Sequence, residues 1–254
     1  LRVAEAAGDF TGRLALLGMG SAPGKTNLMA AVAVRELGGE VDRIDITAGG
    51  RDLDPPDGFA PPYAVQTLLD ELSLRPVVLR GGEPVEIDPL SDAGTVDFPD
   101  PIGDAGAIYT LHSELLTFGS SFGCRESSFR LSLGPAMLER LIELTTAPPH
   151  EVVAATAEAV KPSAETVSVH LIDAYRAGRH VRVSCKTSPI ERWGLGGSVI
   201  STSAPAAAAV RLLAAGKITA RGALPPELAV DPDEMFAQLE RRGAEFNVVE
   251  YSGS

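Results

Sequence analysis

Apolar residues recur along the chain with two different spacings, which together predict strands alternating with helices. Residues 14–17 form a short continuous apolar run, typical of a strand that is buried on both faces. A glycine-rich loop follows, and residues 27–37 have a helical composition that ends at a pair of glycines. Near the other end, Asp231 before Pro232 predicts the start of an amphipathic helix, and residues 244–251 predict a strand.

The middle of the chain is richer in strands. Residues 41–46 and 128–133 alternate as half-buried strands do, and residues 167–172 and 181–185 predict two strands joined by a tight turn. Further expectations are a hairpin over residues 76–87 and helices over residues 65–72, 135–146, 150–160 and 205–215. Residues 47–62 and 88–106 are dense in Gly, Pro and Asp, and they predict loops.

These elements predict an α/β fold whose middle part is α+β. Strands and helices alternate at both ends, which favours parallel βαβ units, whereas the strand-rich middle favours a mixed or antiparallel sheet. We therefore expect one βα layer built from residues 1–40 and 196–254. Residues 41–195 would then be inserted as a second lobe with a mixed sheet.

Composition and charge restrict the function. The chain has 254 residues, 44% of them apolar, which is enough for the core of one large domain or two small ones. It carries 22 basic and 34 acidic residues, a net charge of −12, and no basic cluster, so we expect no nucleic-acid binding. The two cysteines, neither in a CxxC pair, favour a reducing cytoplasm. No apolar run reaches the roughly 18–20 residues of a membrane span, so we expect no membrane partner.

The loop from Gly18 to Thr26 is the strongest local signal. It ends like a phosphate-binding P-loop, but the position that requires the first glycine holds Met19, and Pro23 lacks a backbone N–H. A dinucleotide fingerprint fits better, although its third glycine comes one residue late. Asp45 then stands where a ribose-binding acid would. A strand-to-helix turn that needs glycines only for its tight geometry explains the same residues, and both interpretations remain open.

Two polar positions in the middle lobe are candidates for chemistry. His112 and Glu114 stand two apart on an extended segment, so they face one side and are able to hold a proton donor or bind a carboxylate. Arg130 shares one face of its predicted strand with Ser128 and Ser132, where a guanidinium fork pairs with a carboxylate. For both positions an ordinary polar surface is the alternative. The four histidines include no pair at i and i+4, so we expect no metal site.

Several segments share an order and a spacing that point to a family. The loop reads Gly20-Ser-Ala-Pro23-Gly24-Lys-Thr-Asn27, and Tyr109-Thr-Leu-His112-Ser-Glu114 follows in the middle. Later segments are Gly196-Gly197-Ser198, Gly222-Ala-Leu-Pro225 and Asp231-Pro-Asp-Glu-Met-Phe236. Together these segments, which span nearly the whole chain, resemble the saccharopine dehydrogenase family.

The resemblance implies an oxidoreductase that transfers hydride between NAD or NADP and the C–N bond of an amino-acid-derived secondary amine. It places part of the loop beside the nicotinamide ribose, namely Gly20, Ser21, Pro23, Gly24 and Asn27. On the substrate side it implies Gly49, Gly50, Tyr63, His112, Glu114 and Arg130. Arg130 would hold the substrate carboxylate, and His112 would be the catalytic proton carrier.

The resemblance also implies that different domains bind the cofactor and the substrate. Family members carry an N-terminal Rossmann domain with the dinucleotide fingerprint, so residues 1–40 and 196–254 would complete or abut that lobe. Residues 41–195 would bind a small amino-acid-like substrate and form a homodimer. We expect NAD(P) to be bound mainly by a domain outside this sequence, and the isolated chain to be inactive.

A second interpretation is a non-catalytic dimerisation or small-ligand-binding domain of the same fold. A GxGxxG strand–helix unit encoded upstream of Leu1 would favour the enzyme. The substrate, the choice between NAD and NADP and the reaction direction stay open.

Overall fold

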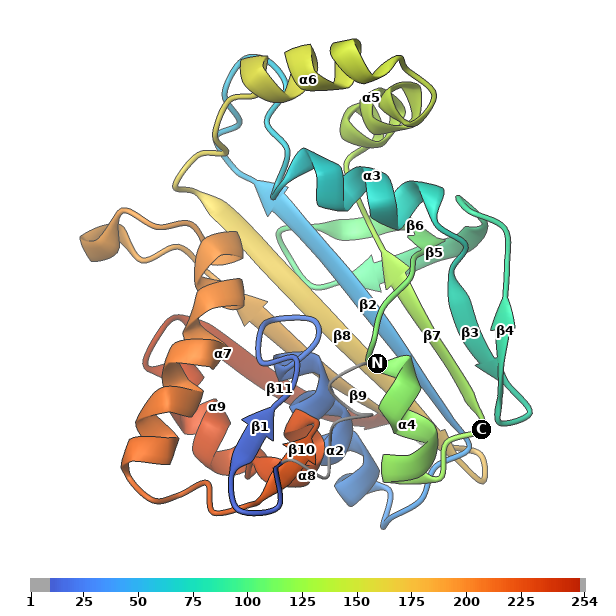
Figure 1. Cartoon of the computed structure of the whole chain (residues 1–254), viewed down its shortest axis with the longest axis vertical. Coiled ribbons are helices and arrows are strands. Elements are labelled where there is room, and N and C mark those ends of the chain that lie inside the picture. The colour runs from blue at the N-terminus through green and yellow to red at the C-terminus, as the bar shows by residue number, and fades with distance from the viewer. Residues whose placement is uncertain (1–9, 252–254) are drawn as a thin grey trace.

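A large mixed sheet organises the chain (Figure 1). The computed structural model describes residues 10–251, so residues 1–9 and 252–254 of the predicted terminal layer lie outside it. The main path of the sheet runs through β11 (Ala244–Tyr251), β9 (Arg179–Thr187), β8 (Thr166–Arg176), β2 (Arg43–Asp52), β7 (Glu126–Leu131), β3 (Val77–Arg80) and β4 (Glu83–Glu86). Strands β5 (Asp92–Phe98) and β6 (Gly103–Tyr109) pair with each other, and β6 also pairs with β7. Because β2 is parallel to β7 and antiparallel to β8, the sheet is mixed as predicted.

Strand β8 shows why the middle of this sheet is so apolar. Val169 and Leu171 belong to a core cluster with Phe98 of β5 on one side of the sheet. Ile172 and Ala174 belong to the largest core cluster, on the other side. Successive side chains of a strand point to opposite faces, so a strand covered on both faces needs apolar residues at nearly every position.

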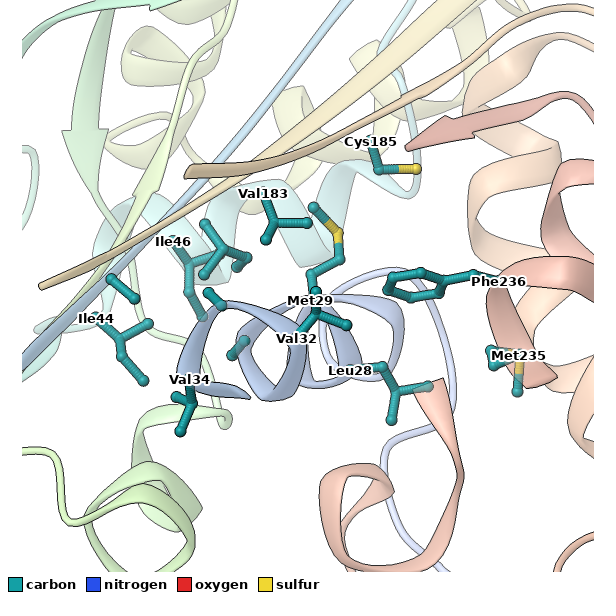
Figure 2. Packing of buried hydrophobic residues seen from close by; sticks show 14 of the residues in the cluster. Leu28, Met29, Val32, Val34, Ile44, Ile46, Val183, Cys185, Met235 and Phe236 are labelled. Atoms are coloured by element: carbon teal, nitrogen blue, oxygen red, sulfur yellow. The ribbon is translucent and has the colours of Figure 1, made fainter. Parts of the chain in front are cut away.

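Helices cover the second face of the sheet. They are α2 (Lys25–Glu36), α4 (Leu115–Phe122), α7 (Gly197–Ala214), α8 (Pro226–Ala229) and α9 (Pro232–Glu240). Nine of the 12 residues of α2 are buried. Figure 2 shows Met29 of α2 beside Val183 of the sheet, with Phe236 of α9 close by. Helix α2 is therefore the centre of the largest core.

A small parallel pair joins the two ends of the chain. Strand β1 (Leu14–Leu16) pairs with β10 (Gly222–Leu224), which gives the predicted βα layer from both termini. The last strand does not follow the predicted boundary at residue 196, because β11 pairs with β9 along its whole length. Without β11, strand β9 would be an unpaired edge of the sheet, and edge strands expose unsatisfied backbone groups.

Parts of two segments predicted as loops are strands. Strand β2 continues to Asp52 because β8 offers backbone partners as far as Thr166. Gly49 in this stretch serves close packing, since a Cβ there would lie 2.8 Å from the ring of Phe98. Residues 88–106, also predicted to be irregular, contain β5 and most of β6. Helix α4 was not predicted.

The remaining helices lie near their predicted positions, except that the helix predicted from Pro205 begins at Gly197 (α7). Helices α3 (Val65–Ser73), α5 (Pro135–Thr145) and α6 (Pro149–Glu158) gather at one end of the molecule (Figure 1), and a short 3-10 turn, η2 (Glu191–Trp193), precedes α7. Asp231 caps α9 by accepting hydrogen bonds from the amides of Asp233 and Glu234, as the sequence predicts. Helix α7 has 18 residues and a mean hydropathy of 1.2, enough by length and composition to cross a membrane, but 44% of it is buried in the protein.

The glycine loop between β1 and α2 closes on itself. The amide of Gly20 donates to the carbonyl of Pro23 (2.8 Å), and the amide of Lys25 donates to the carbonyl of Gly20 (2.9 Å). Gly24 has a φ of 126°, and a Cβ on it would lie 2.4 Å from both the nitrogen and the oxygen of Gly20. The glycines therefore serve a tight strand-to-helix turn.

We expect Gly24→Ala to lower the free energy of unfolding by about 3 kcal/mol or more, because both the positive φ and the backbone collision are penalised. Gly94→Ala is the matched control: it has a φ of 80° with nothing within 4 Å of the added Cβ, so only the backbone strain remains, about 1 kcal/mol. Urea denaturation measures the free energy of unfolding of both variants. Equal losses for the two variants would contradict this account of the loop.

Candidate functional site

A cavity of about 720 Å³ opens beside the start of α2, between the sheet and the helices α3 and α5. The sheet contributes Gly50 of β2, Phe129 of β7 and His170 of β8 to its wall, while Glu71 comes from α3 and Met137 from α5. The loop before α2 contributes Ser21. Strands and helices thus supply part of the wall, and loops supply the rest, including Tyr63 and His112.

His112 lies in this wall between two carboxylates. Its ring stacks on Phe129 with the centroids 3.5 Å apart and the planes 9° from parallel. Its Nδ1 is 3.3 Å from Oε2 of Glu114, and its Nε2 is 3.7 Å from Oε1 of Glu71. Oε2 of Glu114 forms no hydrogen bond with the described residues, so its approach to the ring is an electrostatic contact. Both ring nitrogens of His112 therefore face a carboxyl group.

Glu71 and Tyr63 form the outer part of this group. The hydroxyl of Tyr63 donates to Oε2 of Glu71 at 2.5 Å. Burial raises the pKa of Glu71 above its ordinary value, and the hydrogen bond from Tyr63 and the nearby His112 act in the opposite direction. Burial and the neighbouring carboxylate also raise the pKa of Tyr63, so the phenol remains a donor.

Glu114 connects His112 to the core. Its side chain is fully buried, and its Oε1 accepts a hydrogen bond from Oγ1 of Thr26 at 2.8 Å. Thr26 is itself buried in the first turn of α2. The carboxylate that faces His112 is therefore fixed by a buried helix.

A second polar chain leads from the cavity to a buried amine. Nε2 of His170 is 3.1 Å from Oγ of Ser21, which lies 2.8 Å from Oγ of Ser201. Nζ of Lys25 donates to the same Ser201 oxygen at 2.7 Å. Burial lowers the pKa of Lys25, an effect partly offset by Cys185. Burial, together with the charges of Lys25 and His112, holds the pKa of His170 well below 6.5, so His170 is neutral at pH 7.

The structure brings only part of the sequence-predicted set to the cavity. Ser21, Gly49, Gly50, Tyr63 and His112 line it, and Glu114 lies directly behind His112. The remaining loop residues Gly20, Pro23, Gly24 and Asn27 do not line it. Glu71, His170, Lys25 and Ser201 are new members of the group.

Several of the loop residues predicted to bind the cofactor form hydrogen bonds that stabilise the turn itself. The amide of Gly24 donates to Oδ1 of Asn27 at 2.8 Å, and Nδ2 of Asn27 donates to Glu227 at 2.9 Å. The amides of Gly20, Lys25 and Thr26 are also used within the loop. A pyrophosphate requires free amides at such a turn. These four amides are therefore not free for a pyrophosphate, and Asp45, expected at the ribose, is bound to Ser128 and Arg43 instead.

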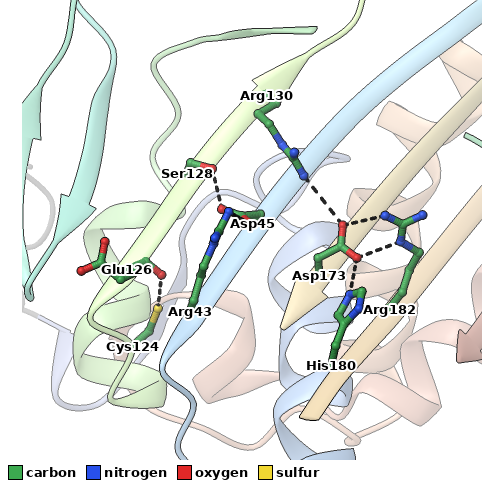
Figure 3. A network of polar contacts seen from close by, with 9 residues as sticks. All are labelled: Arg43, Asp45, Cys124, Glu126, Ser128, Arg130, Asp173, His180 and Arg182. Carbon is green, nitrogen blue, oxygen red and sulfur yellow. Dashed lines mark hydrogen bonds and ion pairs between the residues drawn. The ribbon is translucent and has the colours of Figure 1, made fainter. Parts of the chain in front are cut away.

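Arg130 lies away from the cavity. Its strand alternates as predicted, but Phe129 and Leu131 line the cavity, and Arg130 points to the opposite face of the sheet. There its Nη2 is 3.7 Å from Oδ2 of Asp173, which also binds Arg182 and His180 (Figure 3). The expectation that Arg130 clamps a carboxylate in a cleft shared with His112 is corrected, because its guanidinium is drawn to Asp173.

Comparison with known proteins shows the fold. No protein-family model matches the chain, and no curated protein sequence matches it. Among solved structures, the chain is similar to an apo, histidine-tagged saccharopine dehydrogenase (L-Glu forming) from Saccharomyces cerevisiae. The TM-score is 0.62 at 12% sequence identity, over 92% of this chain and 73% of the yeast chain. The mixed α/β fold is thus similar to that of saccharopine dehydrogenase, an oxidoreductase. Within residues 10–251, no group of three or more His, Cys, Asp or Glu side chains is placed to hold a metal ion.

Because His170 is buried and neutral, we expect it to make the protein less stable in acid. Its folded-state pKa lies well below 6.5, so the unfolded chain takes up a proton that the folded protein does not. Above about pH 6.5 His170 does not change the free energy of unfolding. Below that pH the free energy of unfolding decreases, by up to about 1.4 kcal/mol per pH unit. We expect His170→Gln, whose amide is able to replace the contact with Ser21, to flatten this loss between pH 6.5 and 5.

Urea denaturation at several pH values measures the difference between wild type and variant. His150→Gln is the control, because His150 is exposed on α6 and should leave the profile unchanged. A His170→Gln profile parallel to that of the wild type would show that His170 is protonated in the folded protein.

Proposed function

We propose that this chain forms the substrate side of an NAD(P)-dependent oxidoreductase that acts on the C–N bond of an amino-acid-derived secondary amine. The observation that carries the proposal is His112, held in the wall of a large cavity between Glu71 and Glu114. The similarity in fold to saccharopine dehydrogenase supports the reaction class.

The proposed role of His112 is to exchange a proton with the substrate amine. Chemistry at a C–N bond changes the protonation of the nitrogen, and a histidine is the side chain best suited to this exchange near neutral pH. Stacking on Phe129 fixes the plane of the ring, and Glu71 and Glu114 each approach one of its two nitrogens. Tyr63 donates its hydroxyl to Glu71 and so helps to hold that carboxyl group at the same wall.

The dinucleotide would be held mainly by residues outside this sequence. When bound, it supplies the hydride chemistry, but the amides of Gly20, Gly24, Lys25 and Thr26 in the glycine loop are already hydrogen-bonded within residues 10–251. No catalytic step is therefore assigned to these loop residues.

The self-closed loop also supports a second candidate function, a domain that binds a small amine-containing ligand without redox turnover. Both candidates predict that the 254-residue chain alone shows no saturable binding of NADH or NADPH at micromolar concentrations. Isothermal titration calorimetry measures this, and a micromolar dissociation constant would contradict the structural account of the loop.

Substitution of His112 separates the two candidates. In the complete encoded polypeptide, assayed with NADH or NADPH and paired amine and oxo-acid substrates, we expect His112→Asn to lower kcat/KM by a factor of about 10²–10⁴. The melting temperature should change little, because asparagine fits the same space beside Phe129. His150→Asn, on the exposed surface of α6, is the control. Turnover that survives His112→Asn at the control's rate would refute the proposed role.

A further inference from the structure

The wall of the cavity is largely apolar. Ala48, Phe129 and Leu131 line it from the sheet, and Met137 lines it from α5. Leu133 and a group of prolines, Pro55, Pro56, Pro62 and Pro162, complete this part of the wall. A volume of about 720 Å³ lies in the range of pockets that enclose most of a small organic ligand.

The charged residues of the wall are unsuited to a second carboxylate. Among the described lining residues, Arg51 is the one lysine or arginine, and its Nη1 donates to the carbonyl of Pro101 at 2.8 Å, in the turn between β5 and β6. The acidic side chains of the wall are Asp52, which accepts from the amide of Ser163, and Glu71, which lies beside His112. Lys25 lies behind Ser201, outside the cavity wall.

These contacts determine which substrate branch the cavity accepts. A side-chain carboxylate placed against Leu131 and Met137 would lose its water without gaining a lysine or arginine partner. Desolvation of an unpaired charge is strongly unfavourable, whereas an alkyl branch gains from the same burial.

We infer that the cavity binds the uncharged, apolar branch of an amino-acid-derived amine and rejects an amino dicarboxylate. This inference rests on the proposed function, because it names the substrate class of the same site. The amine nitrogen lies toward His112 and Glu71, and the apolar branch lies against Leu131 and Met137.

Three amino acids of matched length test the inference: norvaline, glutamine and glutamate differ only at the end of the side chain. In calorimetric titrations of the full chain we expect norvaline to bind at least about 10-fold more tightly than glutamate, because only glutamate brings an unpaired charge into the apolar wall. Glutamine, which is polar but uncharged, should fall between them.

A lysine introduced into the wall should reverse this order. We expect Met137→Lys to strengthen glutamate binding by about 10-fold and to weaken norvaline binding, since the new ammonium supplies the missing partner. Ile142→Lys is the matched control: it adds the same charge on the same helix, at a position that is 38% exposed and outside the cavity wall. If Met137→Lys does not fold, the comparison of the three ligands on the wild-type chain alone tests the inference.

The outcomes separate this inference from the proposed function. Glutamate binding as tightly as norvaline overturns the inference and leaves the proposed function in place. Norvaline preference without NAD(P)-dependent turnover of N-substituted norvaline by the complete polypeptide supports the inference and overturns the proposed function. Failure of all three ligands to bind overturns both.

Discussion

The burial of helix α2 is the constraint on which the rest of the structure depends. Its first three residues are polar and almost completely buried, and each binds a different distant segment. Lys25 donates to Ser201 of α7, Thr26 donates to Glu114 just before α4, and Asn27 donates to Glu227 of α8. A buried polar group without a partner costs about 1–3 kcal/mol, so these three bonds determine how the surrounding segments pack. One helical turn thus sets the positions of three elements.

The same turn places the candidate site. Glu114 faces His112 because its other oxygen is held by Thr26, and Ser21 reaches His170 because the glycine loop is closed tightly below it. The site is consequently an extension of the core, in which the positions of its polar atoms are decided before any ligand arrives. Preorganisation of this kind lowers the cost of ordering side chains on binding.

The sequence predicts most of the fold, because hydrophobic periodicity is a local property that survives folding. It does not predict β5, the first part of β6 or the second half of β2, because their Gly- and Asp-rich segments become strands only through backbone partners far away in the chain. The composition of these segments signals a loop, whereas their register with neighbouring strands is a tertiary property.

The site divides in the same way. His112 and Glu114 are recognisable because they are two apart on one segment, whereas Glu71 and His170 join them only through tertiary packing. For Arg130 the alternation correctly separates two faces of the strand, but periodicity does not tell which face bears the cavity. The packing of β5 and β6 against the sheet decides that, and no local pattern encodes it.

The two faces of the sheet differ in where their cationic and anionic side chains lie, and this difference explains why the cavity wall is largely apolar. On the face that carries Arg130, Asp173 is almost fully buried and binds two arginines and a histidine, so these cations are consumed by an internal anion (Figure 3). On the cavity face, the chain instead gathers carboxylates around His112 and keeps Lys25 buried behind Ser201. A binding site for anions in an acidic protein needs lysine or arginine side chains exposed at the site. In this protein Arg130 and Arg182 bind Asp173 on the opposite face, and Lys25 lies behind Ser201, outside the cavity wall.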